Sequence, residues 1–143
     1  MAGPEHLVQA SAVAIDGRAL LIEGVPGSGK SSLALALIDR GAQLIGDDGV
    51  RLELDGDRVI AAPPPNIAGK LEIRGVGIID LPATSAPVAL ILALDEEAPR
   101  FPDPVPVQEL LGQTIPRLLF RAEDANAAIR AEWALRLHGL QLG

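Results

Sequence analysis

The feature that most constrains this chain is the glycine-rich segment at residues 24–31, Gly-Val-Pro-Gly-Ser-Gly-Lys-Ser. It fits the pattern G-x-x-x-x-G-K-[ST] at every fixed position. An apolar run from Ala19 to Ile22 precedes it, and a leucine-rich stretch from Lys30 to Arg40 follows it. A buried strand, a glycine loop and a helix in this order create a phosphate-binding site. The segment therefore predicts an α/β fold built around that loop.

The positions of the loop predict a binding site for a nucleotide and Mg²⁺. Glycines allow backbone angles that turn several N–H groups toward one anion, and the helix N-terminus adds partial positive charge. Lys30 can bridge the β- and γ-phosphates, and the Ser31 hydroxyl can ligate Mg²⁺. A glycine turn that binds nothing is the less favoured alternative. The expected nucleotide-binding residues are Gly24, Gly27, Ser28, Gly29, Lys30, Ser31 and Ser32.

Length and charge restrict the other possibilities. A chain of 143 residues fits one domain, so residues 1–143 are expected to form a single domain. With 12 basic and 19 acidic side chains the formal net charge is −7, which argues against binding to nucleic acid. Cysteine is absent, which excludes disulfides and thiolate metal sites. No signal peptide is visible, and the longest apolar stretch is far shorter than the roughly 20 residues of a membrane span. A cytoplasmic location with no membrane partner is expected.

Acidic residues follow several of the predicted strands. Asp47 and Asp48 come directly after a short predicted strand, 17 residues beyond Lys30. Carboxylates at such a position can hold the metal or deprotonate an acceptor hydroxyl, but two adjacent acids also suit a solvated turn, and both interpretations stay open. Glu72 is more typical of a charged strand face. Asp80 ends a predicted buried strand, where α/β sheets place ligand sites.

The remaining elements predict a mixed sheet with hairpins and a C-terminal helix. Asp16-Gly17 and Asp55-Gly56 are two-residue hairpin turns. The expected strands are residues 7–15, 50–54, 58–61, 76–81, 88–94 and 118–120. Residues 107–111 are expected to form a short helical turn, and residues 123–138 a helix with acidic residues at its start and Arg136 near its end.

Three segments together resemble the HPr kinase/phosphorylase family, in a short form of its C-terminal catalytic domain. They are the loop at residues 24–31, Ile-Gly-Asp-Asp-Gly-Val at residues 45–50, and Ile-Ala-Gly-Lys-Leu-Glu-Ile-Arg-Gly-Val-Gly-Ile-Ile-Asp at residues 67–80. The resemblance covers residues 7–95 well and the last third poorly. It implies a P-loop kinase domain of the phosphoenolpyruvate-carboxykinase-like type.

The resemblance also implies an activity. Members of the family are ATP- and Mg²⁺-dependent protein serine kinases that phosphorylate HPr, a phosphocarrier of the phosphotransferase system, and they form homo-hexamers. By position, Asp47 resembles the catalytic carboxylate that faces the substrate serine, and Lys30, the other expected catalytic residue, resembles part of the phosphate cradle. Ser31, Asp48 and Glu72 resemble the metal-side groups. Arg74 and Asp80 belong to the family signature without an assigned role.

Two of the chain's departures from the family bear on its activity. Gln9 stands where the family usually has a histidine, and glutamine carries neither a proton nor a positive charge. Residues 108–114 occupy the region of a basic loop linked to the reverse reaction but are not basic, which puts phosphorylase activity in doubt. These departures motivate one alternative, a catalytically weak nucleotide-binding sensor or scaffold. The second alternative is another P-loop kinase that acts on a small molecule. Such a kinase normally closes a lid with several arginines over the phosphates, and residues 99–106 contain only Arg100.

Overall fold

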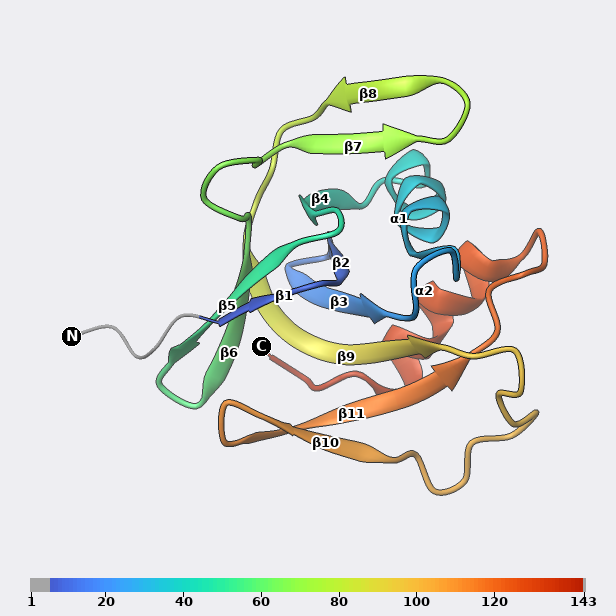
Figure 1. Ribbon diagram of the computed structural model, residues 1–143. Coiled ribbons are helices and arrows are strands. Elements are labelled where there is room, and N and C mark those ends of the chain that lie inside the picture. The colour runs from blue at the N-terminus through green and yellow to red at the C-terminus, as the bar shows by residue number, and fades with distance from the viewer. Residues whose placement is uncertain (1–5, 143) are drawn as a thin grey trace.

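The centre of the structure is strand β9 (Ala86–Leu94), which pairs with three other strands. In the computed structural model, which describes residues 6–142, β9 runs parallel to β3 (Arg18–Glu23) and β11 (Gln113–Phe120) and antiparallel to β6 (Arg58–Ala62). The full order is β1-β5-β6-β9-β3-β2-β4, with β10 paired to β11. This is a curled mixed sheet (Figure 1), as the sequence predicts.

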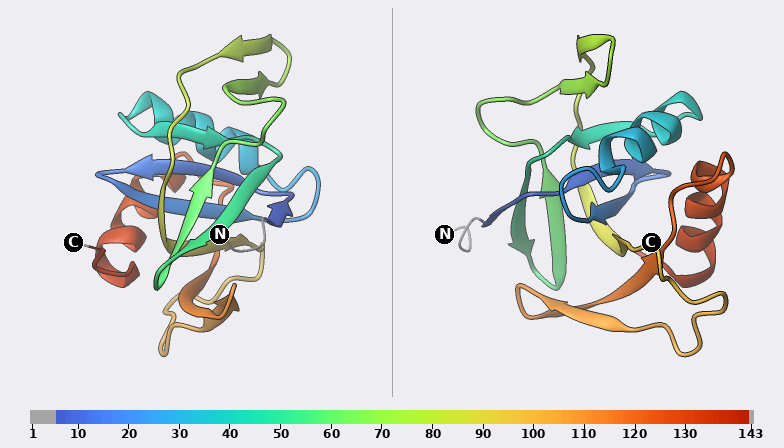
Figure 2. Two further views of the ribbon diagram at one scale, coloured as in Figure 1. Left: turned by 90° about the vertical axis from the view of Figure 1, so that its left-hand side faces the viewer. Right: turned by 45° about the vertical axis from the view of Figure 1, so that its right-hand side comes forward.

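The other elements complete this arrangement. The strands are β1 (His6–Val8), β2 (Ser11–Ile15), β4 (Gln43–Gly46), β5 (Val50–Asp55), β7 (Lys70–Ile73), β8 (Gly77–Asp80) and β10 (Val107–Leu110). The helices within the described residues are α1 (Lys30–Asp39) and α2 (Ala127–His138). Both helices lie on one face of the part of the sheet formed by β9, β3 and β2, and the β5–β6 part of the same sheet curls over the opposite face (Figure 2).

The apolar residues of β3 explain why the sheet has a core on both faces. Leu20 and Ile22 pack with the helices, whereas Leu21 packs with the β5–β6 side. Successive side chains of a strand point to opposite faces, so a continuous apolar run requires cover on both. The buried strand predicted at Ala19 to Ile22 is confirmed, and it ends where the glycine loop begins.

Strands β7 and β8 form a separate two-stranded sheet beside α1 (Figure 1). A strand predicted at residues 76–81 is present as β8, but its predicted place in the core is wrong, because Val76 is 76% and Ile78 69% exposed. The run is apolar, but it belongs to a hairpin that packs mainly through Leu71, which is fully buried. Asp80 is therefore exposed, and it pairs with Lys70 across the hairpin.

Three other predicted boundaries change. The strand expected at residues 7–15 is divided into β1, which pairs with β5, and β2, which pairs with β3 and β4. Residues 107–110 form strand β10, not a helical turn, because they pair with a β11 that begins at Gln113, five residues before the predicted strand. Helix α2 begins at Ala127, so the acidic residues precede it and Asp124 accepts hydrogen bonds from the Asn126 N–H and the Arg130 guanidinium.

Among residues 6–142, neither helix is both long and apolar enough to cross a membrane.

Candidate functional site

The loop between β3 and α1 has the backbone geometry of an anion-binding turn. Gly27 and Gly29 have φ angles of 82° and 102°, in the left-handed region that favours glycine. Gly29 is the N-cap of α1 and supplies no side chain to the helix terminus. The first N–H groups of a helix have no partner within it, so they are available to an anion at this position.

The Lys30 side chain runs back over the loop. Its ammonium group donates hydrogen bonds to the carbonyl oxygens of Gly24, at 2.8 Å, and Val25, at 3.3 Å. These bonds keep the positive charge beside the N-terminus of α1 and add to the partial charge of the helix. The positive charge of the ammonium and that of the helix N-terminus therefore attract an anion to the same place.

Asp47 is held directly behind the loop. The β2–β4 register shifts between Ala12 and Val13, which places a bulge in β4 immediately before this residue, and bulges commonly redirect a side chain near a site. The Asp47 Oδ1 atom accepts hydrogen bonds from the hydroxyls of Ser31, at 2.6 Å, and Ser11, at 3.0 Å. The Glu72 N–H donates to Oδ2 at 3.4 Å.

Asp48 has a different environment from Asp47. Its φ angle of 57° is in the left-handed region, which aspartate tolerates better than most residues. The turn that follows β4 places Asp48 on the wall of a pocket, whereas Asp47 contacts the loop serine. The two adjacent carboxylates therefore have different surroundings.

The pocket has a volume of ≈ 410 Å³ and is bounded by the loop, the first turns of α1, the β4–β5 turn and the β7–β8 hairpin. This volume lies within the range typical of ligand sites. Its lining residues are Pro26, Gly27, Gly29, Lys30, Ser31, Ser32, Leu35, Asp48, Glu72, Ile73 and Arg74.

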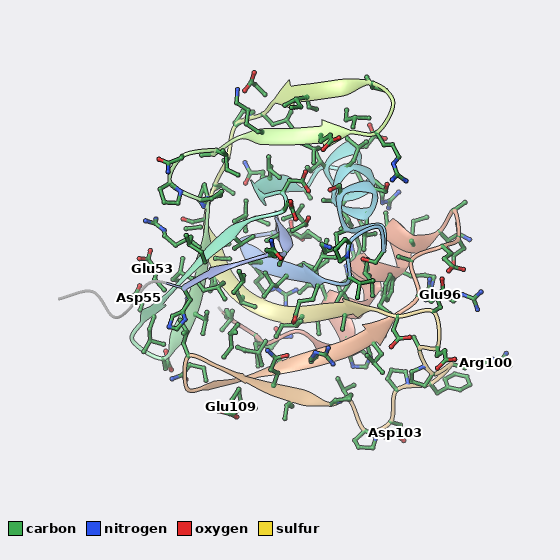
Figure 3. The ribbon with its side chains drawn as sticks, viewed as in Figure 1. Glu53, Asp55, Glu96, Arg100, Asp103 and Glu109 are labelled. Carbon is green, nitrogen blue, oxygen red and sulfur yellow. The ribbon has the colours of Figure 1, made fainter. Side chains whose placement is uncertain are left out.

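The charges of the lining suit a metal-bound anion. Lys30 and Arg74 are positive and Asp48 and Glu72 are negative, so phosphate groups and a divalent cation both meet opposite charge. Several acidic side chains lie elsewhere: Glu53 and Asp55 project from β5 and Glu109 from β10, away from the β7–β8 hairpin (Figure 3).

The donor chemistry fits Mg²⁺ held together with a nucleotide. Within the described residues, no group of three or more His, Asp or Glu side chains is arranged to hold a metal by itself. Mg²⁺ is usually held by one or two carboxylates together with substrate phosphates. The Ser31 hydroxyl and the carboxylates of Asp47, Asp48 and Glu72 are oxygen donors of the kind Mg²⁺ prefers.

The structure brings most of the predicted site residues together. Gly24 and Ser28 belong to the loop but do not line the pocket, and Ser28 Oγ lies against Gly24. Asp80 lies outside the site, because it belongs to the exposed β7–β8 hairpin and pairs with Lys70. Gln9 is exposed and lies between β1 and β2.

Ser11 is the site-related residue that the sequence analysis does not identify. It is a small polar residue in an otherwise apolar strand, which is a weak signal on its own. Only the pairing of β2 with both β3 and β4 reveals that its hydroxyl reaches Asp47.

Gly69 fixes the base of the hairpin that carries Glu72 and Arg74. Its φ angle is 81°, and a Cβ atom added there would lie 2.6 Å from the Leu81 carbonyl oxygen. We expect Gly69→Ala to displace the hairpin and weaken nucleotide binding by about tenfold, because both backbone strain and a backbone clash must be relieved. Calorimetric titration with Mg-ATP measures the effect.

Gly75→Ala is the matched control for that variant. Gly75 also has a positive φ, 77°, and lies in the same hairpin, but a Cβ atom there meets nothing within 4 Å. This control is expected to lose about 1 kcal/mol of stability and little binding. Equal binding losses in the two variants would show that the Leu81 contact has no part in positioning the hairpin.

Comparison with known proteins identifies a family. The model of the HPr Serine kinase C-terminal domain matches residues 2–85. The HPr kinase/phosphorylase of Clostridium acetobutylicum is 42% identical over 80 residues, and that of Clostridium novyi is 46% identical over 82. Each alignment covers 56% of this chain and 26% of the relative, so the matched region spans about a quarter of the relatives' length.

A solved structure extends the similarity to the last third of the chain. The Hpr(Ser) kinase/phosphatase from Coxiella burnetii matches with a TM-score of 0.81 and 33% identity, over 93% of this chain and 90% of that one. The curled mixed sheet and the C-terminal helix are therefore shared with an HPr kinase structure. The family model covers more than half of the residues, and the chain belongs to the HPr Serine kinase C-terminal domain family.

Proposed function

We propose that this chain is an ATP- and Mg²⁺-dependent protein serine kinase that phosphorylates the phosphocarrier HPr. The observation that supports the proposal most directly is the hydrogen bond from the Ser31 hydroxyl to Asp47, beside the Lys30 ammonium and the N-terminus of α1. This arrangement joins a phosphate site to a cation site. The choice of HPr as the phosphoryl acceptor is based on the names of the family and its relatives.

The fold type and the organisation of the chain form part of the same proposal. We assign residues 1–143 to one P-loop catalytic domain of the phosphoenolpyruvate-carboxykinase-like type. The supporting observation is that the loop, Asp48 and the β7–β8 hairpin line one pocket, and that Asp47 accepts a hydrogen bond from Ser31, which also lines it. A cytoplasmic location, expected from the sequence, and assembly into a homo-hexamer, implied by the family resemblance, stay predictions.

Phosphoryl transfer requires position and charge more than covalent participation by the protein. The transition state is loose, with negative charge on the equatorial oxygens of the transferred group. Lys30 and the N–H groups at the start of α1 are placed to stabilise that charge. Bound Mg²⁺ would neutralise phosphate charge, and Ser31 and Glu72 are the residues that would hold it, with Asp47 behind Ser31.

The geometry favours exchanging the roles that the sequence gives to the two aspartates. Asp47 accepts a hydrogen bond from the Ser31 hydroxyl, as a carboxylate next to the metal site would, and it does not line the pocket. Asp48 lines the pocket and is the carboxylate better placed to orient the acceptor hydroxyl and take its proton late in the transfer. We therefore propose Asp48 as the acceptor-facing carboxylate.

The proposed activity is the kinase reaction alone. Residues 107–120 form the β10–β11 hairpin, and its turn at Leu111 and Gly112 carries no basic side chain. A reverse reaction that brings inorganic phosphate to phosphoserine would benefit from positive charge that this turn does not supply. The names of the relatives include phosphorylase or phosphatase activity, which we do not extend to this chain.

Incubation of the chain with Mg-ATP and HPr, followed by mass spectrometry of the acceptor, tests the proposal. We expect one added phosphate on a single serine and ADP formation in equal amount. Binding of Mg-ATP without phosphoserine would support the sensor or scaffold instead. Phosphorylation of a small molecule in a metabolite mixture, with HPr unmodified, would support the small-molecule kinase.

A further inference from the structure

Ser11 is a buried hydroxyl that the proposed reaction leaves without a role. Among residues 6–142 it is the only buried polar or charged residue, with 0% of its surface exposed. Its position is in β2, and its Oγ atom donates to Asp47 Oδ1 at 3.0 Å. A hydroxyl buried without a partner is costly, so this bond is strongly favoured over an unpaired arrangement.

Strand β2 links the two segments that form the cation side of the site. Ser11 pairs with Ile22, two residues before the glycine loop, and Ala12 pairs with Gly46, immediately before Asp47. Ser11 therefore lies on β2, between β3, which leads into the glycine loop, and β4, which leads into Asp47. Its side chain reaches Asp47 from there. The backbone hydrogen bonds of β2 already connect β3 to β4, and the Ser11 side chain adds a hydrogen bond to Asp47.

Two hydroxyls converge on one carboxylate oxygen. Asp47 Oδ1 accepts from Ser11 and from Ser31, and an sp² oxygen has two lone pairs, so both are engaged. With the Ser31 proton directed at Asp47, the lone pairs of Ser31 Oγ point away from it, toward the pocket. The orientation of Asp47 therefore determines where Ser31 directs its lone pairs.

We propose that Ser11 is a positioning residue for the divalent cation. It fixes the Asp47 carboxylate, which in turn fixes the Ser31 hydroxyl with its lone pairs directed at the cation that accompanies the nucleotide. The inference rests on the proposed function, because it requires that Ser31 ligates Mg²⁺. Groups that orient a metal ligand commonly change metal affinity by about 10–100-fold when they are removed.

A matched pair of variants tests the inference. Ser11→Val and Ser11→Thr have nearly the same shape, and only threonine keeps the hydroxyl. Calorimetric titration with ATP is performed in EDTA and at a series of Mg²⁺ concentrations, and the melting temperature of each variant is measured. Ser11→Ala is the smaller deletion to use if the buried position does not accept a larger side chain.

We expect Ser11→Val and Ser11→Ala to raise the Mg²⁺ concentration for half-maximal ATP binding by about 10-fold or more. ATP affinity in EDTA is expected to stay within about twofold of the parent, and Ser11→Thr to restore the Mg²⁺ response. Equal Mg²⁺ responses with and without the hydroxyl would overturn the inference, as would a parallel loss in EDTA, which indicates a purely structural role. If the parent chain binds no Mg-ATP, the proposed function itself fails.

Discussion

Replacement of Asp48 by asparagine is expected to lower kcat for serine phosphorylation by about 10²–10⁴-fold, the usual contribution of a general base. Mg-ATP affinity should change by less than about threefold, because the loop, Lys30 and Ser31 remain in place. Asparagine tolerates the positive φ angle at this position, so the variant adds little backbone strain. Steady-state kinetics with HPr and calorimetry with Mg-ATP measure the two effects separately.

Asp47→Asn is the variant that distinguishes the two assignments. We expect it to raise the Mg²⁺ requirement for ATP binding, because an amide oxygen is a weaker acceptor for the Ser11 and Ser31 hydroxyls than a carboxylate. Asp80→Asn is the matched control, since Asp80 is exposed and outside the pocket, and kcat should stay within about twofold. A large fall in kcat with unchanged Mg²⁺ response in Asp47→Asn alone would restore the assignment made from the sequence.

The sequence predicts the strand, loop and helix of the proposed phosphate-binding site because the information is local. Strand β3, the glycine loop and α1 are contiguous, and their geometry follows from an apolar run, two glycines with positive φ and a leucine-rich helix. The spacing of Asp47 and Asp48 leaves a solvated turn open, and the family resemblance favours a functional role for them. Their separate environments are not predicted, because these depend on a bulge between β2 and β4 and on the left-handed conformation of one residue.

The sequence is misleading where an apolar pattern has two structural solutions. Residues 76–80 are as apolar as a core strand, yet they form the outer strand of an exposed hairpin. Residues 107–110 form a strand because the next segment, residues 113–116, pairs with them across the turn at Leu111 and Gly112. Ser11 shows the same limit for the site. Its proposed role depends on the fold bringing Asp47, 36 positions further along the chain, beside its hydroxyl.

Replacement of Lys30 is the second change expected to lower activity strongly. Lys30→Met is expected to lower kcat by about 10²–10³-fold, as for removal of one preorganised donor to the developing charge. It should also weaken ATP binding by about tenfold or more, because methionine fills a similar volume without the ammonium. The fold is expected to persist, since the carbonyl oxygens of Gly24 and Val25 that lose this donor lie in a partly exposed loop. Calorimetry and circular dichroism measure binding and folding in parallel.

Lys70→Met makes the same chemical change outside the pocket. Lys70 lies in the β7–β8 hairpin and pairs with Asp80 on the surface, where an ion pair contributes roughly 0–1 kcal/mol. Mg-ATP affinity should therefore stay within about twofold of the parent. If both lysine variants bind Mg-ATP alike, the phosphates do not occupy the loop. The ligand would then have to bind through Arg74 and the rest of the hairpin, and the proposed kinase mechanism would lose its anion site.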